Sequence, residues 1–142
     1  MKIQRTVTVD KPLSTVFAYL SDFTTTTEWD PGTVRTVRQS GDGGVGTSYH
    51  NTTKFAGRET ELVYVVEELV PDRRFALRGE NKTLVAHDTL EFSGDGSRST
   101  VTYTADFEFK GLTRFVAPLL APAFTKLGND AERGMREALS RL

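Results

Sequence analysis

The sequence predicts an α+β fold in which an antiparallel sheet packs against one long C-terminal helix. Polar and apolar residues alternate through residues 33 to 110, which is typical of strands with one buried face. From residue 111 to residue 142 the apolar side chains instead recur every third or fourth position, which predicts an amphipathic helix. Because each element has one apolar face, we expect the helix to lie on the sheet.

Two short helical segments are expected between the first strand and the rest of the sheet. Residues 3 to 9 form the first strand, and Asp10 followed by Pro12 predicts a helix that Asp10 caps. The apolar positions of this helix fall on one face: Leu13, Val16, Phe17 and Leu20. The threonine-rich run before Trp29 is compatible with a single helical turn, which Pro31 ends.

Six further strands are expected, at residues 33 to 40, 46 to 56, 58 to 69, 72 to 80, 83 to 93 and 98 to 110. The segments between them are short and rich in turn-forming residues, so consecutive strands must be antiparallel neighbours. Two adjacent glutamates, Glu67 and Glu68, interrupt the alternation and mark an expected β-bulge.

Some polar residues occupy strand positions that the alternation assigns to the apolar face. They are Asn51, Thr53, Arg58, Thr60 and Asp88. A polar group that is buried without a partner costs about 1 to 3 kcal/mol. These residues therefore predict an interior that is wet or that holds a ligand.

Two prolines, Pro118 and Pro122, interrupt the first part of the C-terminal helix. A proline inside a helix removes a backbone hydrogen bond and costs about 3 kcal/mol, so we expect a kink or a separate leading turn. Residues 111 to 121 are interpreted as a lid and residues 126 to 142 as the structural anchor. Mobility of the lid is a hypothesis that follows from the freed backbone groups.

Composition excludes several classes of protein. The chain has 18 Lys and Arg against 19 Asp and Glu, with no basic stripe, so nucleic acid is not an expected partner. It has no cysteine, which excludes disulfides and thiolate chemistry. The first residues alternate and no apolar run approaches the ~18 residues of a membrane span. We therefore expect a cytoplasmic protein without membrane insertion, as a monomer or weak homodimer.

Three further patterns do not predict a cofactor-binding, metal-binding or catalytic site. Residues 41 to 46 match G-x-G-x-x-G, but a strand follows where a dinucleotide site needs a helix, so a hairpin loop is expected. The two histidines, His50 and His87, have no third ligand at metal-binding spacing, so we expect neither a metal nor a cofactor. The absence of G-x-S-x-G leaves a serine nucleophile without support.

The order of elements and several short motifs resemble the START-like (SRPBCC) superfamily, in particular its polyketide cyclase/dehydratase and lipid-transport branch. The motifs are Asp10-Lys11-Pro12, Glu28-Trp29-Asp30-Pro31-Gly32, Gly43-Gly44-Val45-Gly46-Thr47, Pro71-Asp72-Arg73-Arg74-Phe75 and the leading Gly111 of the final helix. The resemblance covers residues 1 to 142 as one domain. It implies a helix-grip fold, in which a curved antiparallel seven-strand sheet wraps the long C-terminal helix, two short helices follow strand 1, and a deep cavity lies between sheet and helix.

A set of aromatic and polar residues is expected around this cavity. It comprises Trp29, Tyr49, Asn51, Tyr64, Phe75, Asp88, Tyr103, Phe107, Phe115, Leu119 and Phe124. Taken singly, each aromatic residue is also typical of a filled core. Together with the polar residues of the same parity, the set favours a pocket, because small-molecule sites are mostly apolar with a few placed polar groups.

The expected function is to bind or carry a hydrophobic small molecule such as a lipid, an isoprenoid or a polyketide-like compound. The alternative is a polyketide cyclase or dehydratase, in which Asp88 is the general base and Arg58 or a tyrosine stabilises a developing enolate. A third class is a protein interaction partner that uses the apolar front of the final helix as its contact surface.

Overall fold

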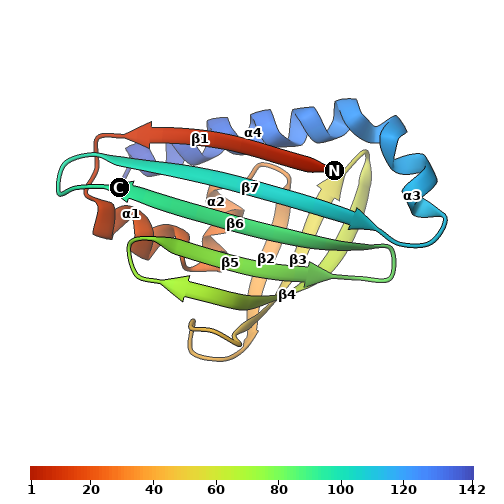
Figure 1. The fold of residues 1–142 in the computed structure, drawn as a ribbon, viewed down its shortest axis with the longest axis horizontal. Coiled ribbons are helices and arrows are strands. Elements are labelled where there is room, and N and C mark those ends of the chain that lie inside the picture. Colours follow the sequence, from red (N-terminus) through yellow and green to blue (C-terminus); the bar gives the residue numbers. More distant parts are fainter.

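The computed structural model describes residues 1–142 and contains one antiparallel sheet with the strand order β1-β7-β6-β5-β4-β3-β2. The strands are β1 (Lys2–Val9), β2 (Thr33–Ser40), β3 (Ser48–Phe55), β4 (Arg58–Val70), β5 (Arg74–Glu80), β6 (Leu84–Gly94) and β7 (Ser99–Phe109). All the expected strands are present, and their ends lie within a few residues of the expected ones. The sheet curves strongly, because β2 and β3 cross the direction of β6 and β7 (Figure 1).

The helical segments cluster in two parts of the chain. Before the second strand lie α1 (Leu13–Leu20), the 3-10 turn η1 (Phe23–Thr25) and α2 (Thr26–Trp29), and after the last strand lie α3 (Thr113–Val116), the 3-10 turn η2 (Ala117–Leu120) and α4 (Ala121–Ser140). In Figure 1, α4 runs along β1, while α3 lies beyond the end of β7. This arrangement confirms the expected helix-grip fold.

The two prolines break the C-terminal helix where the sequence predicts a break. Pro118 lies in η2, and Pro122 occupies the first turn of α4, where a proline removes no helical hydrogen bond. The expected separate leading turn is thus confirmed. No helix is both long and apolar enough to cross a membrane.

The β-bulge expected at Glu67 and Glu68 is also present. Val66 pairs with Leu77 and Glu68 pairs with Ala76, so one residue of β4 has no partner on β5. The bulge increases local twist and contributes to the curvature that opens space under the sheet.

The expected capping of α1 by Asp10 is wrong. The position before the helix is occupied by Pro12, and no side chain caps this end. The backbone N–H of Leu13 instead donates to the carbonyl oxygen of Asp95 in the turn between β6 and β7, at 2.9 Å. Asp10 is exposed and lies 3.9 Å from Arg98. A tertiary contact therefore satisfies the donor that the sequence assigns to a local cap.

The long helix α4 serves two purposes along its length. Its second half contributes Met135, Ala138 and Leu139 to the core, where they join apolar residues of α1 and of the sheet such as Val16 and Leu77. Nearer its start it lines a cavity with the large residues Phe124 and Leu127 and the small residues Gly128 and Ala131. Packing is therefore complete at one end of the helix and incomplete at the other.

Close approach between α4 and α2 depends on Gly134. A Cβ atom at this position would lie 2.0 Å from the carbonyl oxygen of Trp29 and 3.1 Å from Cδ of Pro31. Real Cβ atoms do not approach a backbone oxygen so closely, so only glycine fits. The contact fixes Trp29, and the residue after it, against the helix.

The segment from α3 through η2 exposes several large apolar side chains. Phe115 is 66% exposed and Leu119 is 77% exposed. We expect amides 113 to 120 to exchange hydrogen for deuterium at least about tenfold faster than amides 126 to 140, because this segment has short helical turns and little burial. Exchange measured by mass spectrometry checks this, and equal protection of both segments would contradict the lid hypothesis.

Candidate functional site

A cavity lies between the concave face of the sheet and the first half of α4. Its atom-free space is about 820 Å³, including the part that opens to solvent. Strand residues form most of the wall, from Ile3 on β1 to Phe107 on β7, and α4 closes it with Phe124, Leu127, Gly128 and Ala131. The wall is mostly apolar, and its polar side chains come from α2 and the residue after it and from strands β2, β3, β4, β6 and β7.

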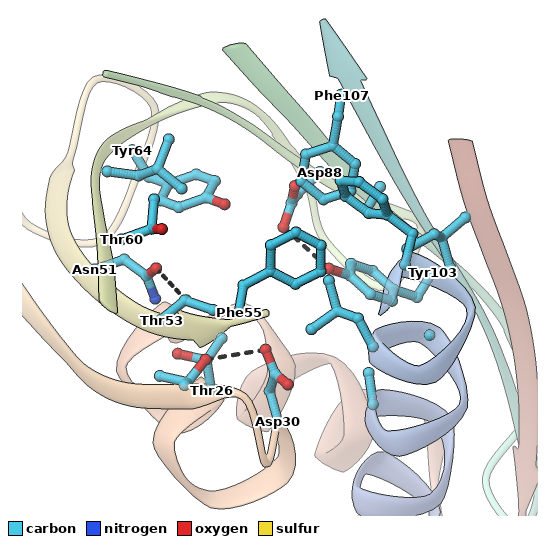
Figure 2. Close-up of a pocket in the computed structure, with 18 of the residues that line it drawn as sticks. Thr26, Asp30, Asn51, Thr53, Phe55, Thr60, Tyr64, Asp88, Tyr103 and Phe107 are labelled. Carbon is cyan, nitrogen blue, oxygen red and sulfur yellow. Dashed lines mark hydrogen bonds between the residues drawn. The ribbon is translucent and has the colours of Figure 1, made fainter. Parts of the chain in front are cut away.

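Asp88 is the central polar residue of this wall. It comes from the middle of β6, is 5% exposed, and points into the cavity in Figure 2. The hydroxyl of Tyr103 on β7 donates a hydrogen bond of 3.2 Å to Oδ2 of Asp88. Oδ1 is buried and has no hydrogen-bond partner.

Burial raises the pKa of Asp88 to about 7, because the charged form loses its solvation. The hydrogen bond from Tyr103 acts in the opposite direction, and the nearby carboxyl of Asp30 raises the pKa further. Near neutral pH both the protonated and the ionised form of Asp88 are thus populated.

A second carboxyl group, Asp30, lies directly after α2. The backbone N–H of Gly32 donates to Oδ1 at 3.0 Å, and the hydroxyl of Thr33 donates to Oδ2 at 3.0 Å. Burial raises the pKa of Asp30, and these two hydrogen bonds partly oppose the shift. Figure 2 shows Asp30 across the cavity from Asp88.

Three polar side chains on the β2 and β3 side satisfy one another. The amide nitrogen of Asn51 donates to the hydroxyl of Thr36 at 2.9 Å. The hydroxyl of Thr53 donates to Oδ1 of Asn51 at 2.7 Å (Figure 2). The hydroxyls of Thr36 and Thr26 are 2.7 Å apart and share a further hydrogen bond. This network fixes the Asn51 side chain, so it forms a rigid part of the wall.

Trp29, the only tryptophan, borders the same polar region. Its indole ring meets the ring of Tyr103 edge to face, with centroids 5.6 Å apart. Its Nε1 is buried without a hydrogen-bond partner. The polar end of the cavity thus contains two unsatisfied groups, one acceptor on Asp88 and one donor on Trp29.

The opposite end of the cavity is aromatic. The ring of Phe124 contacts those of Phe55, Phe107 and Phe109, with centroids 4.6, 5.0 and 5.8 Å away. Phe107 pairs with Ala86, two residues from Asp88 on β6, so the aromatic end begins about 7 Å from Asp88 along the sheet. The site is therefore polar at one end and apolar at the other.

Seven of the residues expected around the cavity lie on its wall: Trp29, Asn51, Tyr64, Asp88, Tyr103, Phe107 and Phe124. Tyr49 and Phe75 do not line it. Both are buried in the core, where their rings lie 5.6 and 6.4 Å from that of Phe23. Strand parity gives the face on which a residue lies but not its position along the strand, which explains both differences.

Phe115 and Leu119 also lie off the wall, because α3 and η2 extend past the end of the sheet and leave these side chains in solvent. Arg58, the residue expected to stabilise an enolate in the cyclase alternative, is exposed at the first position of β4 and does not line the cavity. Thr60, two residues further on, does line it. The expected cavity positions of Phe115, Leu119 and Arg58 are thus corrected.

Sequence reasoning did not single out Asp30 or Phe55 as site residues, and both line the cavity. Asp30 follows a helical turn, where no periodicity assigns a face. Phe55 is the last residue of β3 and has the parity of Asn51 and Thr53, so its strand pattern contained the signal.

The histidines lie away from the cavity. His50 pairs with Glu61 at 3.2 Å and His87 with Glu108 at 3.7 Å, all on partly or fully exposed side chains. No cluster of three or more His, Cys, Asp or Glu residues is placed to hold a metal ion. Residues 41 to 46 form the turn between β2 and β3, as expected for a hairpin loop.

With this geometry established, comparison with known proteins identifies the family. The model of the family described as polyketide cyclase / dehydrase and lipid transport matches residues 1–142. The chain belongs to this family. The resemblance drawn from the sequence motifs is therefore confirmed. A comparison with curated proteins finds no match.

Solved structures share the family fold with little sequence identity. The Zhui aromatase/cyclase from a Streptomyces species matches with a TM-score of 0.82 at 16% identity, over 99% of this chain and 94% of that one. A protein from Thermus thermophilus matches with a TM-score of 0.80 at 12% identity, over 96% and 95%. A START superfamily protein from Mycobacterium smegmatis matches with a TM-score of 0.74 at 14% identity, over 99% and 94%. At such identities the likeness extends to the fold alone.

Proposed function

We propose that the protein binds one small, mostly apolar molecule in the cavity and acts as its carrier or receptor. The family description names polyketide chemistry and lipid transport, and both concern apolar molecules with a few polar groups. The ligand class is therefore a lipid, an isoprenoid or a polyketide-like compound. Its polar end would lie at Asp88 and its apolar body would reach towards Phe124.

The unpaired Oδ1 of Asp88 is the observation that carries this proposal. A buried polar atom without a partner costs about 1 to 3 kcal/mol, which a structural residue would avoid. A polar group on a bound ligand would supply the missing partner. The apolar remainder of the wall would bury the rest of the ligand.

Filling the cavity is expected to weaken binding. Ala105 lies on the cavity wall and its neighbour Thr104 points to the opposite face of β7, where Gln4 donates to its hydroxyl. Ala105→Phe should weaken binding of the neutral dye N-phenylnaphthylamine by at least about tenfold, because the new ring occupies the ligand's space. Thr104→Phe introduces the same ring on the opposite face of β7, outside the cavity, and should leave the affinity unaltered.

Dye fluorescence titrations of the two variants and the parent protein measure this effect, with circular dichroism to confirm that each variant is folded. Saturable binding at one dye per chain is required of the parent protein. Equal affinity of both variants would place the dye elsewhere and contradict the proposal.

The raised pKa of Asp88 favours a second candidate function, general acid–base catalysis of the cyclase or dehydratase type. A base acts best when its pKa lies near the working pH, and burial brings Asp88 to about 7. If this function holds, the Asp88 carboxylate would remove a proton from the carbon between the carbonyl groups of a 1,3-diketone and return it. In deuterated water, NMR would then detect faster deuterium uptake at that carbon with the parent protein than with Asp88→Asn. Equal uptake with the two proteins would exclude it.

A further inference from the structure

We propose that the ligand carries a protonated amine at one end of an apolar body, and that the ammonium group binds between Asp88 and Asp30. This inference rests on the proposed function, because it names the class of molecule that the same cavity takes. Its evidence is the distribution of charge on the cavity wall.

Both charged residues on the wall are acids. Asp30 and Asp88 line the cavity, and no lysine, arginine or histidine does. Arg5 approaches from β1, but its guanidinium donates to Asn129 on α4 at 3.0 Å and lies 3.7 Å from Glu132. The cavity wall therefore carries two carboxyl groups and no basic side chain to pair with them.

The unpaired oxygen requires a donor from the ligand whenever Asp88 is a carboxylate. A carboxylate only accepts hydrogen bonds, and Tyr103 already satisfies Oδ2. An ammonium group supplies three N–H donors and a positive charge, so it can bond to Oδ1 of Asp88 and neutralise it. A fatty acid would place a further carboxylate beside the carboxyl groups of Asp30 and Asp88, which low-dielectric surroundings make unfavourable.

The aromatic residues at the polar end suit a cation as well. Tyr103 bonds to Asp88, and Trp29 meets its ring edge to face. Tyr64 lies on another part of the cavity wall (Figure 2). A cation within about 6 Å of such a ring face is attracted by the ring's quadrupole. Further along the cavity, Phe107 and Phe124 offer an apolar surface for the body of the molecule.

Amine binding is expected to depend on pH. The titratable groups that face Asp88 are Tyr103 from β7, Tyr64 from β4 and Asp30 after α2, while α4 presents only apolar residues and glycine. Because the ammonium group binds the carboxylate, affinity should rise as pH increases from 5 to about 8 and level off above that. Binding at pH 7 should release protons, since the ligand favours the deprotonated form of Asp88.

Three probes with the same apolar chain test the proposal on the full-length protein: decylamine, decanol and decanoate. Trp29 emission reports binding, because it is the only tryptophan and borders the site. At pH 7.5 we expect decylamine to bind about tenfold more tightly than decanol, because charged hydrogen bonds are stronger than neutral ones, and decanoate to bind weakest. Asp88→Asn should bring decylamine and decanol to similar affinities. Glu91→Gln, an exposed acid on the same strand, should keep the parent preference.

The outcomes separate this inference from the proposed function. If none of the three probes and no neutral dye binds, the proposed function fails and the inference fails with it. If decanol or decanoate binds as tightly as decylamine, the cavity is a binding site but the inference is overturned. Calorimetry of the parent protein in two buffers of different ionisation enthalpy provides a second test that needs no variant. Proton release with decylamine supports the inference, and its absence contradicts it.

Discussion

Asp88→Asn is expected to remove the loss of stability, about 3 kcal/mol, that the parent protein undergoes between pH 5 and pH 8. Burial raises the pKa of Asp88 to about 7, whereas the unfolded chain titrates this group near its ordinary value of 3.8. Between these two values the folded protein holds one proton more than the unfolded protein. Stability from this group is therefore fully present below about pH 4 and is lost as the pH rises through 7.

Urea unfolding of both proteins at pH 5, 6, 7 and 8 measures the effect. The free energy of unfolding of Asp88→Asn, relative to that of the parent, should increase with pH across this range. Glu91→Gln should follow the parent curve, because Glu91 is exposed and its only ion pair, 3.5 Å from Arg74, lies on the surface and contributes little. Parallel curves for the parent and Asp88→Asn would show that the carboxyl is not buried as described.

Gly134→Ala is expected to destabilise the protein by about 3 kcal/mol, the upper part of the range for overpacking. Alanine favours a helix by about 1 kcal/mol over glycine, so propensity alone predicts the opposite result. The new Cβ would lie 2.0 Å from the carbonyl oxygen of Trp29, and a backbone atom cannot rotate away. Either α4 or α2 must shift, and the packing of both must loosen.

Gly96→Ala is the matched control, because a Cβ at Gly96 meets no atom within 4 Å. Its free energy of unfolding should stay within about 0.5 kcal/mol of the parent value. Urea unfolding monitored by Trp29 emission measures both variants. An unchanged or higher stability of Gly134→Ala would mean that helix propensity outweighs the contact with α2.

Strand alternation predicted the polar part of the site well. Asn51, Thr60 and Asp88 share the parity of apolar neighbours, and a curved sheet that faces a helix brings such residues to one interior. The alternation was informative because a strand side chain can point only to one or the other face of the sheet. It could not say how far along a strand the cavity extends, which is why Phe75 lies in the core and Arg58 in solvent.

The helical periodicity of residues 111 to 142 was less informative. It gave Phe115 and Leu119 the same face as Phe124, but the sheet ends before it reaches α3. A period identifies an apolar face without identifying what that face meets. No sequence pattern indicated the position of Asp30, since this position depends on the tertiary contact between Gly134 and Trp29.

The two acids of the cavity belong to different layers of the molecule. Asp30 follows α2, which Gly134 holds against α4, and Asp88 is part of the sheet. A ligand bound to both would connect the layers, so the empty protein is expected to open more often than the loaded one. Proteases act on opened chains, and degradation in the cell follows the population of such states. The lifetime of the protein would then follow the supply of its ligand, and its abundance would report whether that ligand is present.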